Sequence, residues 1–421
     1  RMAKDVHPPR GMRDFLPLEK SRRDLVLSRI RETYLSHGFQ EVETPALEDL
    51  ERLTSGQGGD NEKLAFRVMK RGEELDRGIA KVLAGIDDED GVDVADNLAD
   101  LGLRFDLTVP LTRYYATNRA KLPNVFKALQ TGPVWRAERP QKGRYRQFVQ
   151  CDIDIIGDAS ELAEIELLNA SLDALAAIGL SDATIRVNHR ILLANLLEGL
   201  GVPAEGRGLA MIIIDKLDKI AAEGVTKELA EKFGDEVAAR AAKWLATIEG
   251  KLDAPAELQN IFSAVEARFG SGRLRFDPTL VRGMGYYTGA IFEIEHPGSG
   301  SSIGGGGRYD GMVGRWLGQD VPAVGISIGF ERAVDLVEQP QELDPKALVL
   351  VLSEANPVVI GNALKIQAEA IAVGYRVRIE TRPKKLNILL EQLAENGFGT
   401  FASVNEESAN FSALELRSLA K

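Results

Sequence analysis

One stretch constrains the fold more than any other: residues 134–157, which read VWRAERPQKGRYRQFVQCDIDIIG. In its second half apolar and polar side chains alternate: Val149, Cys151, Ile153 and Ile155 are separated by Gln150, Asp152 and Asp154. A period of two places the apolar residues on one face of a strand and the polar residues on the other. Pro140 and Gly143 favour a turn, so the pattern predicts two antiparallel strands joined by a loop.

The predicted loop is basic, although the whole chain has a net charge of -11. Five basic residues fall within eleven positions: Arg136, Arg139, Lys142, Arg144 and Arg146. Such a local reversal of charge favours an anionic ligand. With the carboxylates and the amide of the following strand, it predicts a platform for a zwitterion and a polyphosphate. The alternative is a solvated turn whose basic residues form only surface ion pairs.

Composition narrows the class of protein. A chain of 421 residues, 44% hydrophobic and 27% charged, is typical of a globular protein with about two to three domains. No apolar run approaches the roughly 20 residues that a membrane span needs, and the single cysteine, Cys151, fits a small core residue in a reducing cytoplasm. The four histidines are scattered, so we expect no zinc site. The acidic total argues against a general nucleic-acid coat but allows a shape-specific RNA partner.

Three further segments carry polar residues that recur in the argument below. Residues 101–118 place Asp106 and Thr108 two apart, on one face if the segment is a strand. In residues 280–295, glycines allow Arg282 and Tyr287 to project together. Residues 301–313, SSIGGGGRYDGMV, lack the Gly-Lys-Ser/Thr of a P-loop, so their glycines predict close approach of a strand or a ligand.

Residues 323–338 predict a strand that enters a helix at Gly329, with Arg332 in its first turn. A cation is unfavourable at a helix N-terminus, which indicates that an anion compensates it. Residues 159–180 predict an amphipathic helix with one apolar side formed by Leu162, Ile165, Leu168 and Leu172. From Lys346 onward, strands and helices alternate as in a small parallel α/β domain, in which Asn356 and Pro357 predict the start of a helix.

We therefore expect four segments: a catalytic domain in two parts, 1–181 and 276–341, a mostly helical insertion, 182–275, and a C-terminal domain, 342–421. The acidic run at 86–100 is interpreted as a solvated surface without a chemical role.

Several blocks resemble a known family when read in order: VETP, WRAERPQKGRYRQF, VRGMGYYTG, GGRYDG and GISIGFERA. The chain resembles the histidyl-tRNA synthetases, which are class II aminoacyl-tRNA synthetases, from RGMRDFLP to the C-terminal domain. The resemblance implies an α+β fold in which helices flank a six-stranded antiparallel catalytic sheet. It also implies a helical insertion, a C-terminal α/β anticodon-binding domain, a homodimer and a cytoplasmic location.

The activity implied is that of a histidine–tRNA ligase. L-histidine and ATP give histidyl-adenylate and pyrophosphate, and the histidyl group then passes to the 3′ end of the histidine tRNA. Magnesium is expected on the β- and γ-phosphates, with no metal site formed by the protein alone. The second candidate is a non-catalytic paralogue, either a regulatory subunit of ATP phosphoribosyltransferase or a sensor of uncharged tRNA. Such paralogues typically lose histidine-block arginines.

The resemblance also assigns residues. Arg136 matches the α-phosphate arginine, and Arg282 the histidine-block arginine placed against the α-phosphate and the substrate carboxylate. Glu138 matches the adenine-end acid, and Arg332 the γ-phosphate arginine. Asp106, Thr108 and Gln150 match the groups around the substrate ammonium, and Asp154, Tyr287 and Tyr309 those around the imidazole. Arg139 and Gln141 match the contact to the extra 5′ guanosine of the tRNA. Two departures are Gly285, where most members have aspartate, and Asp154, where many bacterial members have glutamate.

Overall fold

The computed structural model describes residues 6–54, 64–85, 94–140, 143–248, 250, 252–283, 285–338 and 344–419. Contacts divide the chain into two compact units, Arg1–Asp14 with Leu25–Val337, and Phe15–Asp24 with Glu338–Lys421. The boundary falls inside α1 (Pro17–Ser36), which ends before Gly38 at a φ of 83°. Within the described ranges, no helix has the length and apolar character needed to span a membrane.

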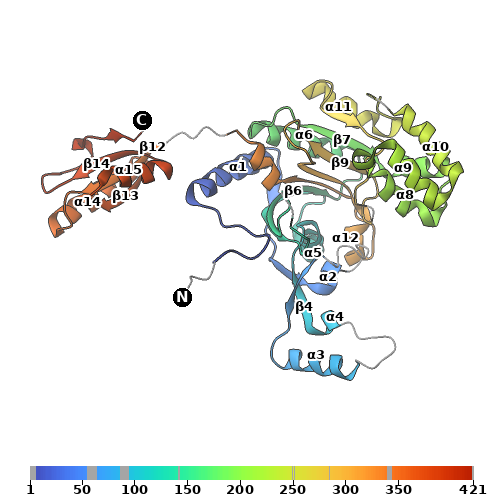
Figure 1. Ribbon diagram of the computed structural model, residues 1–421, viewed down its shortest axis with the longest axis horizontal. Coiled ribbons are helices and arrows are strands. Elements are labelled where there is room, and N and C mark those ends of the chain that lie inside the picture. Colours follow the sequence, from blue (N-terminus) through green and yellow to red (C-terminus); the bar gives the residue numbers. More distant parts are fainter. Residues whose placement is uncertain are drawn as a thin grey trace. The chain divides into compact units, whose positions relative to one another are not determined.

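A large sheet organises the first unit (Figure 1). Over the described residues it has eight strands, in the order β1 (Gln40–Glu41), β5 (Phe126–Trp135), β6 (Gln147–Ile156), β11 (Ala323–Gly329), β10 (Gly304–Arg308), β9 (Ala290–Glu295), β7 (Thr184–His189) and β8 (Leu274–Phe276). The strands from β5 to β7 in this order are antiparallel, and β1 and β8 add short parallel edges. The antiparallel catalytic sheet is confirmed, with two edge strands beyond the six expected.

The predicted hairpin is also confirmed. β5 and β6 pair antiparallel from Phe126↔Ile156 to Trp135↔Gln147. On one face of β6, the apolar side chains Cys151, Ile153 and Ile155 join the main core. On the other face, the polar side chains Gln150, Asp152 and Asp154 line a cavity. The period of two thus separates a hydrophobic face from a polar face, as the sequence predicts.

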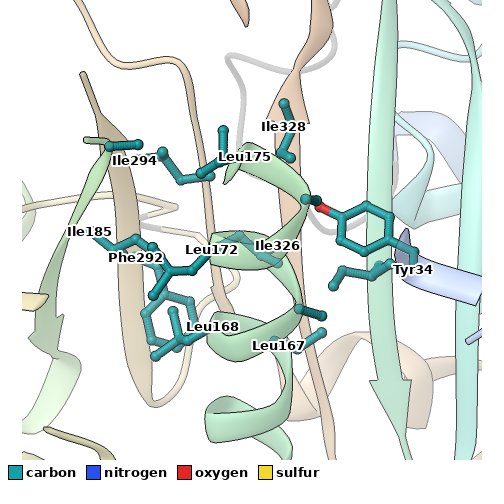
Figure 2. Packing of buried hydrophobic residues seen from close by; sticks show 14 of the residues in the cluster. Tyr34, Leu167, Leu168, Leu172, Leu175, Ile185, Phe292, Ile294, Ile326 and Ile328 are labelled. Atoms are coloured by element: carbon teal, nitrogen blue, oxygen red, sulfur yellow. The ribbon is translucent and has the colours of Figure 1, made fainter. Parts of the chain in front are cut away.

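The main core lies between the sheet and α6 (Leu162–Ala177). Figure 2 shows the packing of Leu167, Leu168, Leu172 and Leu175 of α6 with Ile185, Phe292, Ile294, Ile326 and Ile328 of the sheet. Each fully buried side chain of this kind contributes about 1.5–3 kcal/mol. The predicted apolar side is wrong at one position: Leu162 is 53% exposed, because the helix begins there.

A buried ion pair links α6 to the end of β10. Arg308 donates from Nε and Nη2 to the two carboxylate oxygens of Glu164, each at 2.6 Å. Both residues are under 10% exposed. The fork of the guanidinium matches the carboxylate, which is the strong geometry for such a pair.

The sequence placed Asp106 and Thr108 on one face only if residues 101–118 form a strand, and around these two residues they do not. β4 (Ala99–Leu103) ends before Asp106, and α5 (Thr108–Asn118) begins at Thr108. Asp106 Oδ1 accepts a hydrogen bond from Val109 N at 3.0 Å. A short acidic side chain that binds a backbone N–H two or three residues ahead favours a helix start over a strand.

Helices fill the chain between β7 and β8: α7 (Arg190–Gly199), α8 (Arg207–Ile214), α9 (Leu217–Phe233), α10 (Asp235–Thr247) and α11 (Gln259–Phe269). α7 to α10 share a separate core that includes Leu197, Ile213, Val225 and Leu245. His189 acts as the cap of α7, accepting from Ile191 N at 3.1 Å. β7 and β8 belong to the large sheet, so the predicted insertion, 182–275, contains β7 and ends within β8. The division into four segments stays a proposal.

The remaining elements of the first unit are short. A small sheet has the order β2 (Leu47–Asp49), β4 and β3 (Phe66–Met69). The other helices are α2 (Leu50–Thr54), α3 (Glu73–Ala84), α4 (Val94–Leu98), α12 (Asp310–Leu317) and α13 (Phe330–Leu336). The strand β11 runs directly into α13 at Gly329, as predicted. Of the acidic run, residues 86–93 lie outside the described ranges.

The second unit contains the predicted parallel α/β domain. Its sheet has the order β13 (Arg376–Thr381), β12 (Asp344–Leu352), β14 (Phe398–Val404) and β15 (Arg417–Ser418), and β15 alone is antiparallel to its neighbour. The helices are α14 (Pro357–Ala372) and α15 (Leu386–Glu395). Asn356 caps α14 by accepting from Val358 N and Val359 N, with Pro357 in the first turn, as the sequence predicts.

Candidate active site

A cavity of about 450 Å³ opens on the face of the large sheet opposite α6. The predicted residues that line it are Asp106, Thr108, Arg136, Glu138, Gln150, Asp154, Arg282, Tyr287, Tyr309 and Arg332. They come from β6, α13 and the start of α5, and from segments flanking α5, β5, β9 and β10. Arg139 is exposed and does not line the cavity, and Gln141 lies outside the described residues.

Arginines gather at one end of the cavity. Arg136 follows β5 and donates from Nε to Phe105 O at 3.0 Å, with its guanidinium 5.0 Å from the centre of the Phe148 ring. Arg282 and Arg332 meet at Ser302: Arg282 Nη1 lies 3.4 Å from Ser302 Oγ, and Arg332 Nη1 donates to Ser302 O. Positioned guanidiniums of this kind suit a polyphosphate.

The charge of Arg332 is only partly balanced locally. Burial lowers the pKa of Arg332, the neighbouring cations Arg144 and Arg282 lower it further, and the carboxylate of Glu293 opposes them. Two like charges next to a third in a partly buried site are unfavourable until an anion arrives. The arginine end of the cavity is therefore electrostatically prepared for a negatively charged ligand.

Carboxylates gather at the other end. Asp154 is buried, and its Oδ1 accepts a hydrogen bond from Tyr309 OH at 2.5 Å. Burial raises the pKa of Asp154 to about 7, the Tyr309 hydrogen bond opposes the rise, and Asp106 adds to it. Among the described residues, nothing forms a hydrogen bond with the buried Oδ2 of Asp154. An unsatisfied buried acceptor is costly, so this atom favours a ligand that brings an N–H.

A second unsatisfied acceptor belongs to Gln150. Its Nε2 donates to Ser327 Oγ at 3.1 Å and lies 3.5 Å from Asp152 Oδ1. Its Oε1 is buried and has no partner in the described parts of the chain. The contacts on Nε2 fix which way the amide points, and they leave the oxygen to accept from a ligand. Burial, followed by the charge of Asp154, raises the pKa of Asp152 well above its ordinary value.

Glycines let the functional side chains lie flat on the sheet. A Cβ on Gly325 would come within 1.9 Å of Asp154 Oδ1, and a Cβ on Gly305 within 2.7 Å of Arg282 Cζ. A Cβ on Gly307 would meet the Tyr287 ring at 2.9 Å. These two glycines of β10 provide close approach of protein side chains. Gly306, where a Cβ would lie 2.0 Å from Gly325 O of β11, provides the close approach of a strand, which is one of the two uses predicted for these glycines.

Sequence reasoning missed several residues at the cavity. Glu331 accepts from Arg13 Nη2 at 2.7 Å and from Val149 N at 3.2 Å. Arg13 also stacks 3.8 Å from the centre of the Tyr145 ring, so the RGMRDFLP segment reaches the basic hairpin. Asp152 had a usable signal, because it shares the polar strand face with Gln150 and Asp154. Glu331 and Glu293 had none beyond their charge.

The two ends together describe the ligand. The arginines suit an anionic group, and the unpaired acceptors Gln150 Oε1 and Asp154 Oδ2 suit a ligand that brings N–H groups. Over the described residues, there is no group of three or more histidine, cysteine, aspartate or glutamate side chains arranged to hold a metal.

Comparison with known proteins gives a consistent result. The family model described as histidyl-tRNA synthetase matches residues 11–76 and 87–333. The histidine–tRNA ligase of Leifsonia xyli subsp. xyli is 52% identical, with 99% of each chain covered. The probable histidine–tRNA ligase of Tropheryma whipplei strain Twist is 43% identical, over 94% of this chain and 95% of the relative.

Solved structures share the fold. The crystal structure of histidyl-tRNA synthetase from Nostoc sp. PCC 7120 aligns with a TM-score of 0.75 at 24% identity, covering 99% of this chain and 95% of that one. An ATP phosphoribosyltransferase regulatory subunit/histidyl-tRNA synthetase from Bacillus halodurans aligns with a TM-score of 0.70 at 19% identity, covering 96% and 98%.

Proposed function

Because the chain belongs to the histidyl-tRNA synthetase family, we propose that its cavity activates L-histidine with ATP and that the enzyme transfers the histidyl group to histidine tRNA. The observation that carries this function is the pairing, in one cavity, of an arginine end with an end of unpaired acceptors. A full-length relative named histidine–tRNA ligase, 52% identical, supports the same activity.

In the first step, a carboxylate oxygen of histidine attacks the α-phosphorus of ATP. A new P–O bond forms, the bond between the α-phosphorus and the bridging oxygen breaks, and pyrophosphate leaves. Two anions must approach, so alignment and charge stabilisation provide most of the catalysis. We assign the α-phosphate to Arg136 and Arg282 and the γ-phosphate to Arg332. Glu138, which lies 3.7 Å from Arg144, orients the adenine end.

Histidine is recognised by the opposite end. Asp106, Thr108 and the Oε1 of Gln150 receive the ammonium group. Asp154 Oδ2 accepts from the imidazole, and Tyr287 and Tyr309 enclose the ring. A smaller or apolar amino acid would leave these buried acceptors unpaired, which can give rejection of about 10⁴-fold or more without editing. Of these acceptors, Asp154 Oδ2 distinguishes histidine from amino acids whose side chains lack an N–H.

In the second step, a hydroxyl of the 3′-terminal adenosine attacks the carbonyl carbon of histidyl-adenylate, and AMP leaves. We assign the acceptor end of the tRNA to the hairpin loop with Arg139 and Gln141, of which Gln141 lies outside the described residues. The C-terminal domain, from residue 342, is proposed to bind the anticodon.

Magnesium is proposed to enter with the β- and γ-phosphates. The carboxylates of Glu293 and Glu331 line the cavity, and each already accepts from an arginine. Magnesium keeps several waters and needs only one or two carboxylates beside phosphate oxygens, so either residue fits that role. A homodimer in the cytoplasm completes the proposal, and both features follow from the family resemblance.

One experiment tests the function: pyrophosphate exchange measured separately with each of the twenty amino acids. We expect exchange with histidine and little with the others. Arg282→Ala is expected to lower the histidine-dependent rate by about 10²-fold or more, because one positioned charge at the transferred group is worth that much. Exchange within a few fold of the parent would contradict the role of Arg282.

The same assay separates the second candidate. A regulatory or sensing paralogue would bind histidine without exchange. The neighbour from Bacillus halodurans, whose name includes such a subunit, is 19% identical, so the similarity supports the fold alone. The presence of Arg136, Arg282 and Arg332 in one cavity favours the enzyme.

A further inference from the structure

Arg282 is held from behind by a carboxylate that it shares with a second arginine. Arg282 Nη1 donates to Glu293 Oε2 at 2.7 Å. The other oxygen of the same carboxylate, Oε1, accepts from Arg186 Nη1 at 3.0 Å. Glu293 on β9 therefore lies between an arginine of the cavity and an arginine of β7, the neighbouring strand.

Arg186 is itself firmly anchored. It is 8% exposed, and its Nε donates to Asp277 Oδ2 at 2.7 Å. Its Nη1 also lies 3.3 Å from Glu295 Oε1. Burial by itself would lower the pKa of Arg186, but Asp277 and the two glutamates raise it above its ordinary value. A buried ion pair with several partners is rigid, because losing one partner leaves an uncompensated charge.

This arrangement solves two problems for Arg282. A long arginine side chain has many rotamers, and the guanidinium of Arg282 lies so close over Gly305 that a Cβ there would come within 2.7 Å of Arg282 Cζ, so its position must be fixed. A carboxylate devoted to Arg282 alone would fix it but would also cancel its charge. Because Arg186 shares Glu293, the carboxylate can orient Arg282 while the guanidinium retains attraction for a phosphate.

We propose that Glu293 and Arg186 are positioning residues for Arg282, and that Arg186 acts on histidine activation through Glu293 without touching the substrates. Arg186 does not line the cavity, whereas Glu293 and Arg282 do. The inference rests on the proposed function and deepens it, because it extends the phosphate-binding apparatus to a buried residue of β7.

The test compares Arg186→Gln with the parent enzyme in histidine-dependent pyrophosphate exchange. We expect the maximal rate to fall by about 10- to 100-fold, since a misplacement of about 1 Å at the reacting group can cost that much. The histidine concentration at half-maximal rate should change by less than about 3-fold, because the groups around the ammonium and the ring are outside this network. A rise in this histidine concentration as large as the fall in the maximal rate would overturn the inference.

Arg275 provides a matched control. It lies on β8 beside β7 and contacts the same acids, Glu295 at 2.8 Å and Asp277 at 3.5 Å, but its side chain is 48% exposed. Arg275→Gln removes the same charge from the same cluster without a recorded contact to Glu293. We expect its maximal rate to stay within about 2-fold of the parent, as exposed ion pairs contribute little. A loss as large as that of Arg186→Gln would mean that any charge removed from the cluster has this effect.

A double-mutant cycle tests whether Arg186 acts through Arg282. In an Arg282→Lys background, adding Arg186→Gln should change the rate by less than about 3-fold, because the single guanidinium that it positions is already absent. Full additivity would overturn the proposal. If Arg186→Gln fails to fold, Arg186→Lys takes its place: it keeps the charge but lacks the fork that bridges Glu293 and Asp277, so an intermediate loss is expected and a parental rate counts against the idea.

The outcomes distinguish a failure of the proposed function from a failure of the positioning role of Arg186. A parent protein without histidine-dependent exchange would refute the proposed function. A parent that exchanges normally, together with an unimpaired Arg186→Gln, would refute only the positioning role.

Discussion

The folded protein buries the carboxyl group of Asp154 in surroundings that favour its neutral form. Burial raises the pKa of Asp154 to about 7, against the hydrogen bond from Tyr309. In the unfolded chain the same group titrates near its ordinary value, about 3.9. The folded state therefore binds the proton more tightly, and its stability falls as the pH rises from about 4 through about 7. A ligand N–H at Oδ2 would relieve this cost.

Removing the titration should therefore stabilise the empty enzyme at high pH. We expect the free energy of unfolding of Asp154→Asn, relative to the parent, to increase by about 2–3 kcal/mol between about pH 5 and pH 8. Urea unfolding of the ligand-free proteins at both pH values measures the change. The exposed Asp335→Asn serves as the control for loss of one negative charge. A relative stability that stays flat or falls with pH would refute this reading of Asp154.

At the scale of single residues, the sequence could place Asp154 on the polar face of a strand, because alternation alone decides that. It could not predict the raised pKa, which depends on the burial of the strand and on Asp106, located in a different segment. Nor could it predict that Gln150 presents its oxygen, since Ser327 on β11 orients the amide across the sheet.

At the scale of elements, β10 is a strand made almost entirely of glycine. Its missing side chains leave room for Arg282 and Tyr287. We expect Gly305→Ala to lower the maximal exchange rate by about 10-fold or more and to destabilise the fold by about 1–3 kcal/mol, because the new Cβ would lie 2.5 Å from Phe292 O and 2.7 Å from Arg282 Cζ. Exchange assays and urea unfolding measure the two effects.

Gly311→Ala is the matched control for that change. Gly311 lies in α12, and a Cβ there would meet nothing within 4 Å. Activity should be unchanged, and the free energy of unfolding should rise by up to about 1 kcal/mol, because alanine favours a helix over glycine. An active Gly305→Ala enzyme would show that Arg282 does not need the space above that strand.

The elements that the sequence predicted correctly are those with a strong local signal. The alternation in β6 and the Asn356-Pro357 start of α14 are examples. The sequence left the element around Asp106 and Thr108 open, because two polar residues are too few to define a period. There a local contact decided the structure, because Asp106 binds the backbone of Val109 at the start of α5.

At the scale of the whole molecule, contacts separate a unit that contains the cavity from a unit that contains the C-terminal sheet. Three basic residues after β13, Arg382, Lys384 and Lys385, are exposed in the second unit of an otherwise acidic chain. Phosphate contacts from such a cluster depend on charge and are sensitive to salt. We therefore expect them to contact tRNA.

Replacing all three with alanine should raise the KM for tRNA in aminoacylation by about 10-fold and weaken its dependence on salt. Pyrophosphate exchange should stay unchanged, because activation needs only the first unit. Lys365→Ala provides the comparison, because it removes an exposed cation of α14 that donates to Ala409 O. Loss of exchange in the triple variant, or no effect on charging, would refute the assignment.

The residues that escaped prediction are explained at this scale. Arg186 and Glu293 are 107 positions apart, and Arg13 and Glu331 are 318 apart. No spacing rule links residues over such distances, and charged residues of this kind are common on surfaces. Arg186 and Glu293 come into contact only when β7 pairs with β9 in the folded sheet.

The run of glycine in β10 has a consequence for how the sheet assembles. A shift of one residue in strand register normally costs free energy, because it turns polar side chains toward the core and apolar side chains toward solvent. Gly304 to Gly307 carry nothing to turn inward, so those residues alone cannot tell the correct alignment from its neighbours. The forked pair of Arg308 with Glu164, at the end of the strand, supplies what they lack. This ion pair fixes the register of a strand whose missing side chains leave space for the substrates.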